Sequence, residues 1–155
     1  MKHQSISASR PGWILICLFL LGFAAPGALA ADWEFETQLI WGTNDPASPD
    51  PNHKPVDAEV RKKLGELPLK WTHYFEIKRE QFSVAKGEST KASLGGKCAL
   101  EVKIVENKKV EVTWFGKNGE EVGKQTQPLR KGEYVVLGGN APNATVWLVT
   151  LKRVK

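Results

Sequence analysis

The sequence predicts an all-β domain, mainly an antiparallel β-sandwich or small barrel of about eight short strands, with one short surface α-helix near residues 57–67. Three observations predict this class. Apolar residues recur at every second position, turn-forming residues interrupt them about every ten residues, and only one segment has helical periodicity. Strand patterns alone do not show whether a sheet closes, so we prefer the sandwich and keep the barrel as the alternative.

Residues 1–30 have the composition of a signal peptide. Lys2 and Arg10 supply a positive start, residues 13–25 are an apolar run, and an Ala-Leu-Ala cleavage site follows. We therefore expect residues 31–155 to form a single β-rich domain that is periplasmic or extracellular. The apolar run is short for a membrane span of about 20 residues, so we expect no membrane span after processing. An uncleaved anchor is the alternative.

The charge of the processed chain is mild. The whole sequence has a formal net charge of +5, and two of its positive charges, Lys2 and Arg10, lie in the leader. The remaining lysines alternate with glutamates along the expected strands, whereas a nucleic-acid-binding protein has a concentrated basic stripe. We therefore expect a solvated surface of mixed charge and no nucleic-acid partner.

Cys98 is the one cysteine left after processing, because Cys17 lies in the leader. No disulfide can then form within the chain, so an apolar core has to hold the domain together. Cys98 shares a strand face with Leu100 and Val102, and we expect it to be a buried small hydrophobic side chain. Pairing between two chains stays open, as does the oligomeric state.

The first strand is predicted at residues 32–43, where an apolar face from Trp33 to Trp41 alternates with a polar face from Glu34 to Gln38. This pattern is typical of a strand with one covered and one solvated side. Residues 43–55 form a proline-rich loop.

The predicted helix follows at residues 57–67. Asp57 is its N-cap and Pro68 stops it. Val60, Leu64 and Leu67 form one apolar stripe, so the helix should lie on the domain with its basic side in solvent.

Several short strands are predicted in the middle of the chain. A strand at 70–79 ends in a turn near Glu80, a short strand surrounds Phe82 and Val84, and an edge strand covers 90–94. Residues 97–105 and 109–115 form a hairpin in which Asn107 takes a left-handed conformation. After the Asn118-Gly119 turn, residues 121–127 are poor in apolar side chains and predict another edge strand.

The hairpin at residues 133–153 is the stretch around which we expect the fold to be built. Both of its strands are apolar on both alternating faces; for example, Val146 and Leu148 oppose Trp147 and Val149. Strands of this kind are normally covered on both sides. We therefore predict the pair at the centre of a sheet.

Two loops at strand ends, 43–55 and 138–144, are the candidate binding surfaces for a protein partner or a glycan, because loop tips on a rigid β scaffold commonly carry recognition. The candidate binding residues in them are polar, apart from one tryptophan beside the first loop. They are Trp41, Asn44, Asp45, Asp50, Asn140 and Asn143. Asn143 also begins an N-glycosylation pattern, which matters only in a cell that glycosylates.

No metal site, cofactor site or catalytic group is predicted. The oxygens of the 43–55 loop match no EF-hand spacing and are ordinary turn chemistry. The histidines of the processed chain, His53 and His73, and the single Cys98 do not supply a zinc ligand set. His73 with Cys98 is the one conceivable thiol pair, and both positions suggest an interior location.

The five tryptophans from Trp33 to Trp147 all lie on expected strands, and four share the apolar parity, so we expect them to be core side chains. An exposed sugar-binding platform is the alternative, and Trp41 is its first candidate.

The first hypothesis for function is therefore an exported, non-enzymatic β-domain that serves as an envelope or secreted protein-interaction module. The second is a carbohydrate-binding module that uses exposed tryptophans. The third is a small hydrolase, because outward glutamates are plentiful.

Overall fold

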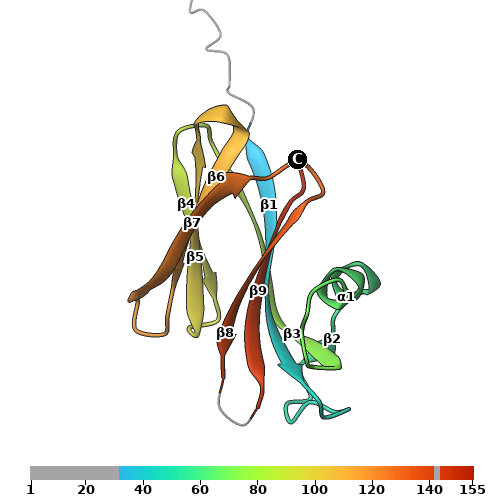
Figure 1. Cartoon of the computed structure of the whole chain (residues 1–155). Coiled ribbons are helices and arrows are strands. Elements are labelled where there is room, and N and C mark those ends of the chain that lie inside the picture. Colours follow the sequence, from blue (N-terminus) through green and yellow to red (C-terminus); the bar gives the residue numbers. More distant parts are fainter. Residues whose placement is uncertain (1–31, 142–143) are drawn as a thin grey trace, which may run out of the picture.

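The computed structural model describes residues 32–141 and 144–155 (Figure 1). The predicted leader, residues 1–30, lies outside this range, and so does Asn143. The elements in chain order are β1 (Trp33–Thr43), β2 (Lys54–Pro55), α1 (Ala58–Gly65), β3 (His73–Val84), β4 (Ser89–Leu94), β5 (Cys98–Val105), a 3-10 turn (Glu106–Lys108), β6 (Lys109–Phe115), β7 (Glu121–Pro128), β8 (Tyr134–Asn140) and β9 (Val146–Arg153).

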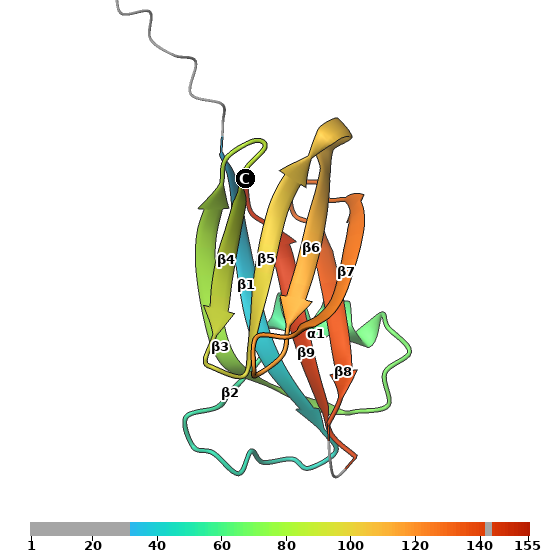
Figure 2. The same ribbon diagram turned by 90° about the vertical axis from the view of Figure 1, so that its left-hand side faces the viewer.

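The described strands form two antiparallel sheets that face each other and do not close into a barrel (Figures 1 and 2). The five-stranded sheet has the order β2-β3-β1-β9-β8, and the four-stranded sheet has the order β4-β5-β6-β7. The predicted all-β sandwich with one short helix is therefore confirmed.

The predicted hairpin at 133–153 exists, but its place in the sheet differs from the prediction. β8 and β9 pair in register from Tyr134↔Lys152 to Asn140↔Val146. β9 also pairs with β1, whereas β8 is the edge strand, so β1 is the central strand of the five. The prediction of a central pair was wrong for β8, because sheet order depends on the distant partner β1 and not on the hairpin itself.

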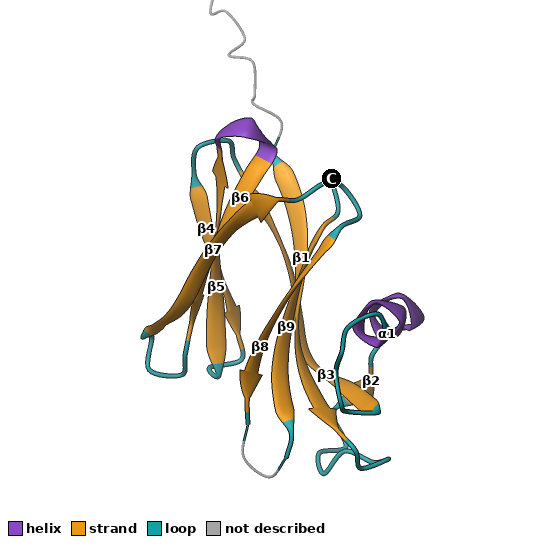
Figure 3. Ribbon diagram, viewed as in Figure 1, coloured by secondary structure: helices purple, strands orange, loops and turns teal. Residues whose placement is uncertain are grey.

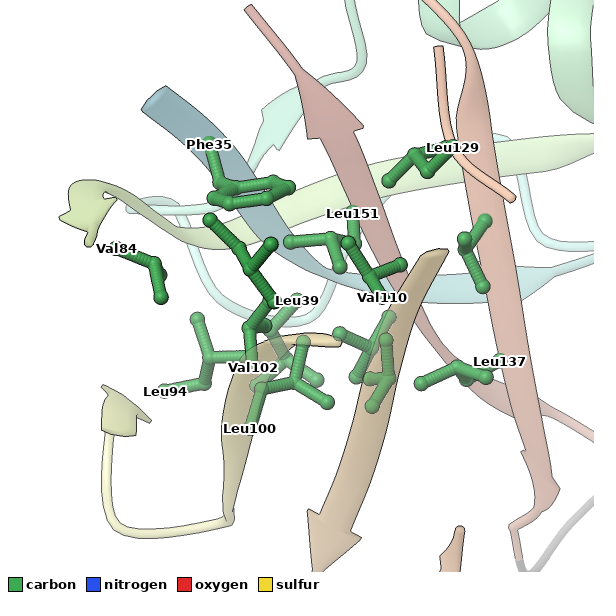
Figure 4. Packing of buried hydrophobic residues seen from close by; sticks show 14 residues of the cluster. Phe35, Leu39, Val84, Leu94, Leu100, Val102, Val110, Leu129, Leu137 and Leu151 are labelled. Carbon is green, nitrogen blue, oxygen red and sulfur yellow. The ribbon is translucent and has the colours of Figure 1, made fainter. Parts of the chain in front are cut away.

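The main core lies between the two sheets (Figure 4). Phe35 and Leu39 from β1, Leu137 from β8 and Leu151 from β9 meet the inward side chains of β4, β5 and β6. Phe35 and Leu151 are completely buried. Burying one such side chain contributes about 1.5–3 kcal/mol, so this layer supplies the stability that a disulfide supplies in many smaller domains.

A second apolar cluster covers the outer face of the five-stranded sheet. Val60 and Leu64 of α1 pack with Ile40, Val146 and Leu148 of the sheet. The carboxylate of the N-cap Asp57 accepts the backbone N–H of Val60 at 2.8 Å, which begins the helix as predicted. The two faces of β9 are therefore covered by different layers, as the sequence predicted for this strand.

The helix also explains why β1 departs from its expected solvated side. Gln38 and Ile40 are 1 % and 0 % exposed, although both lie on the face predicted to be wet. The pairing of β1 with β3 shifts between Leu39 and Ile40, and such a β-bulge re-aims the side chains that follow it. Ile40 then packs in the cluster under α1.

Three local predictions were wrong for identifiable reasons. β3 continues through Glu80 without a turn, because its polar residues pair with β1 along their whole length. Leu67 lies beyond the end of α1 and is 38 % exposed, so it does not belong to the helix stripe. The left-handed residue of the β5–β6 connection is Lys108, with φ 58°, and not Asn107.

A charged cluster ties α1 to the sheet beneath it. The guanidinium of Arg79 donates to carboxylate oxygens of Glu36 at 3.1 Å, Asp57 at 2.8 Å and Glu76 at 2.6 Å. Lys152 adds a contact of 2.7 Å to Glu59 of the helix. These bridges join β1, β3, β9 and the start of α1.

The strands run up and down, so the connections gather at two ends (Figure 3). The lower end in Figure 3 carries the chain between β1 and β2, the β4–β5 and β6–β7 turns, the end of β8 and the start of β9. In the described part of the chain, no helix has the length and apolar character needed to cross a membrane.

Candidate functional site

The two sheets enclose a cleft of about 600 Å³ at the lower end of the sandwich, between the β4–β5 and β6–β7 turns on one side and the end of β8 on the other. Its volume falls within the range of about 300–1,000 Å³ that is usual for small-molecule sites. The lining residues come from both sheets. They are Leu39, Gly95, Gly96, Lys97, Cys98, Trp114, Phe115, Gly116, Lys117, Val122, Leu137, Gly138, Gly139, Trp147 and Val149.

The cleft has an apolar floor and an accessible mouth. Leu39, Leu137 and Val149 belong to the main core and form the floor. At the mouth, Val122 of the edge strand β7 is 60 % exposed. An apolar ligand group could therefore enter from solvent and reach the core without displacing a buried side chain.

Glycines explain why the sheets leave space here. Gly139 has the same strand parity as Val135 and Leu137, both core residues, and a Cβ added to it would meet no atom within 4 Å. A larger residue at this position would fill the cleft. The turn at Gly95 and Gly96 on the opposite sheet also lacks side chains, and both glycines have positive φ angles, of 70° and 69°.

Two indoles form the aromatic walls, and each is held by a neighbour. A Cβ added to Gly123 would lie 2.3 Å from Cζ2 of Trp114, so the indole lies directly against the backbone of β7. The ammonium of Lys97 lies 4.8 Å from the ring centroid of Trp147, within the range of a cation–π interaction. Both tryptophans also pack against the main core.

The charges that line the cleft are all positive. Lys97 and Lys117 are its charged lining residues, and both are exposed. Within residues 32–141 and 144–155, neither ammonium lies within ion-pair distance of a carboxylate. Cys98 lies half-buried in the wall, and burial raises the pKa of its thiol, so the neutral form is favoured.

The polar residues predicted in the 43–55 loop have local partners instead. Asn44 Oδ1 accepts the backbone N–H of Thr72 at 3.1 Å. The carboxylate of Asp50 accepts both the backbone and the side-chain N–H of Asn52 at 2.9 Å. Asp45 is exposed, and its backbone N–H donates to Thr43 Oγ1 at 3.1 Å. The Asn44 bond joins the loop to the residue before β3, and the contacts at Asp50 and Asp45 are turn-stabilising bonds. None of these side chains lines the cleft.

The other predicted positions lie at the same end of the sandwich. Trp41 is half-buried, with its ring centroid 6.0 Å from Phe75 and 6.4 Å from His53, outside the cleft. Residues 138–140 belong to β8 and not to a loop, so the predicted loop 138–144 is shorter than expected. Asn140 is the last residue of β8 and pairs with Val146.

The expectation that all five tryptophans are core side chains was too strong. Each is partly exposed, and Trp114 and Trp147 line the cleft. Trp71 donates its indole N–H to the carbonyl oxygen of Ala144 at 2.6 Å, which fastens the β8–β9 connection to the start of β3. Strand parity correctly identified Trp33, Trp114 and Trp147 as pointing toward the main core, whereas Trp71 packs in the cluster under α1. Strand parity carries no information on how far the sheets diverge.

Chemically, the arrangement is suited to binding. Cys98 lines the cleft and His73 does not, so the one thiol–imidazole pair considered in the sequence is not brought together there. His73 instead lies 2.9 Å from Thr72 Oγ1. Among the described residues, no group of three or more His, Cys, Asp or Glu side chains has an arrangement that could hold a metal ion.

Comparison of the chain with protein-family models, with curated proteins and with solved structures gave no match.

Proposed function

We propose that the processed chain is an exported, non-enzymatic binding module, and that its ligand places an apolar group in the cleft between the sheets. The observation that carries this proposal is the cleft of about 600 Å³ between the sheets, which is lined by core side chains and by the partly exposed Trp114, Trp147 and Val122. Export rests on the signal-peptide pattern of residues 1–30.

The character of the walls favours an apolar ligand over a glycan. A sugar platform needs an aromatic face that is open to solvent and surrounded by polar groups. Gly123 lies against the indole of Trp114, and the ammonium of Lys97 lies over the ring of Trp147. The floor residues Leu39 and Leu137 offer no hydrogen bonds to hydroxyl groups.

A protein partner is the second candidate, in line with the first hypothesis from the sequence. The edge strand β7, which carries the exposed Val122, supports it, because an extended peptide can pair with an exposed sheet edge. Such a partner would insert an apolar side chain into the same cleft, so both candidates depend on the cleft being open.

The test is the binding of N-phenyl-1-naphthylamine, a neutral apolar dye whose fluorescence rises in apolar surroundings. We expect saturable binding to residues 31–155. Gly139→Leu should abolish it, because the new side chain would occupy open space in the cleft.

The matched control is Gly65→Leu, which adds the same side chain at the exposed end of α1, also in open space. It should bind the dye like the wild type. Absence of dye binding to the wild type, or equal binding by Gly139→Leu, would overturn the proposal.

A further inference from the structure

The charged residues that line the cleft are two lysines, and among the described residues neither ammonium has a carboxylate within ion-pair distance. Lys97 lies in the β4–β5 turn and Lys117 in the β6–β7 turn, so they border the cleft from two adjacent connections of the four-stranded sheet. No Asp or Glu is among the lining residues. The carboxylate of Glu120 lies against the lining residue Gly116 and accepts the backbone N–H of Asn118 at 2.9 Å.

Lys97 lies at the edge of the apolar wall of the cleft, next to Trp147. Its ammonium is held over the ring of Trp147, 4.8 Å from the centroid. A cation in contact with an indole lies at the boundary between the apolar interior and solvent. A ligand that fills the cleft would therefore have its apolar part against Leu39 and Leu137 and its outer end beside this charge.

We propose that the cleft binds a single-chain anionic amphiphile, a molecule of the fatty-acid type. Its hydrocarbon chain would pack on Leu39, Leu137 and Val149, and its carboxylate would lie between Lys97 and Lys117. This inference rests on the proposed function, and it adds the charge and the chemical class of the ligand. The complementarity is twofold, since an apolar floor matches the chain and the two lysines match the headgroup.

The test uses competition with the bound dye N-phenyl-1-naphthylamine. Three amphiphiles with the same hydrocarbon chain are compared below their micelle concentrations: dodecanoate, dodecanol and dodecyltrimethylammonium. We expect dodecanoate to displace the dye about tenfold more effectively than dodecanol, because its carboxylate gains contacts with two exposed ammonium groups. The cationic amphiphile should be the weakest, and added salt should reduce the differences.

The double variant Lys97→Gln with Lys117→Gln isolates the charge. Its own dye affinity is measured first, because Lys97→Gln also removes the cation–π contact to Trp147. Relative to that reference, it should lose the preference for dodecanoate, with an affinity for that ligand about tenfold lower. The matched control is Lys86→Gln with Lys131→Gln, which removes the same charge from exposed turns at the opposite end of the sandwich. This control should behave like the wild type.

Cys98 gives a second readout that does not depend on the dye. Its thiol lines the cleft, so dodecanoate should slow its alkylation by a maleimide several-fold in the wild type and less in the double lysine variant. Equal protection by all three amphiphiles would overturn the proposal.

The outcomes distinguish the proposed apolar binding cleft from the proposed anionic amphiphile ligand. If the dye binds but the three amphiphiles compete equally, the charge assignment fails and the apolar cleft stands. If the dye binds and no amphiphile competes, the amphiphile proposal fails in favour of a protein partner. If the dye does not bind, both proposals fail.

Discussion

Replacing Gly123 by alanine tests the packing of the aromatic wall. A Cβ at this position would lie 2.3, 2.7 and 2.8 Å from three atoms of the Trp114 indole. These atoms belong to a rigid ring, so the whole side chain has to shift. Overpacking of this kind costs about 1–3 kcal/mol, and the reduced freedom of the unfolded chain offsets about 0.4–1 kcal/mol of that. We expect a net loss of about 1–2 kcal/mol.

The matched control is Gly139→Ala, the same substitution on the facing edge strand, where the new methyl group meets nothing within 4 Å. Without a clash, it should stabilise the protein by up to about 1 kcal/mol. Both variants are measured by urea unfolding followed by circular dichroism, with the slope of the transition unchanged. Equal stability of Gly123→Ala and Gly139→Ala would refute the packing of Trp114 described above.

Three further predictions concern the contacts around α1. Arg79→Gln should lower the free energy of unfolding by about 1 kcal/mol in urea at neutral pH, since it removes the counterion of three carboxylates; an unchanged midpoint would contradict this. Burial raises the pKa of Glu36 and Asp57, but hydrogen bonds and Arg79 outweigh it, so both pKa values lie below their ordinary values of 4.5 and 3.8. The stabilisation from these carboxylates is therefore complete above the ordinary values and is lost as the pH falls through the lower folded-state pKa values. In acid titrations the wild type should lose more stability than Arg79→Gln, and parallel losses would argue against the linkage. Gln38→Met should leave stability unchanged or raise it by up to about 1 kcal/mol, because Gln38 Oε1 is buried and accepts no hydrogen bond from the described residues. A clear loss of stability in urea would show that the hydrogen bond donated by the Gln38 amide to Glu36, at 3.1 Å, outweighs the cost of burying Oε1.

Much of the fold could be predicted from period-two hydrophobicity, because the side chains on a buried strand face are mostly apolar and those on an exposed face are mostly polar. The hairpin from Cys98 to Phe115 is an example, since Leu100, Val102, Val110 and Val112 all point inward and are all completely buried. Local patterns were sufficient there because both strands pair with a neighbour in sequence.

The order of the strands in a sheet could not be predicted from such local patterns. β1 is the central strand of its sheet through its pairing with β9, more than a hundred residues later, where Thr37 Oγ1 donates to the carbonyl oxygen of Thr150 at 2.9 Å. Gln38 is polar in sequence and buried in the fold, where β1 is paired on both sides, with Arg79 of β3 and Thr150 of β9 opposite Gln38. No window around Gln38 contains those elements.

The cleft was missed because it arises from the separation of two sheets and not from any one segment. A usable signal was nevertheless present. Two glycine pairs, Gly95-Gly96 and Gly138-Gly139, lie at strand ends, and the hairpin pattern brings those ends to the same side of the sandwich. Paired glycines beside the inward-facing Trp114 and Trp147 leave space that the sequence could have indicated.

Chemical-shift mapping by NMR tests the central claim most directly. Isotope-labelled residues 31–155 are titrated with dodecanoate, and the backbone amide shifts are followed. The cleft predicts that perturbed amides cluster at residues 95–98, 114–117 and 137–139 and in the indole N–H groups of Trp114 and Trp147. Perturbations confined to the 43–55 loop, or spread evenly over the surface, would contradict a binding site between the sheets.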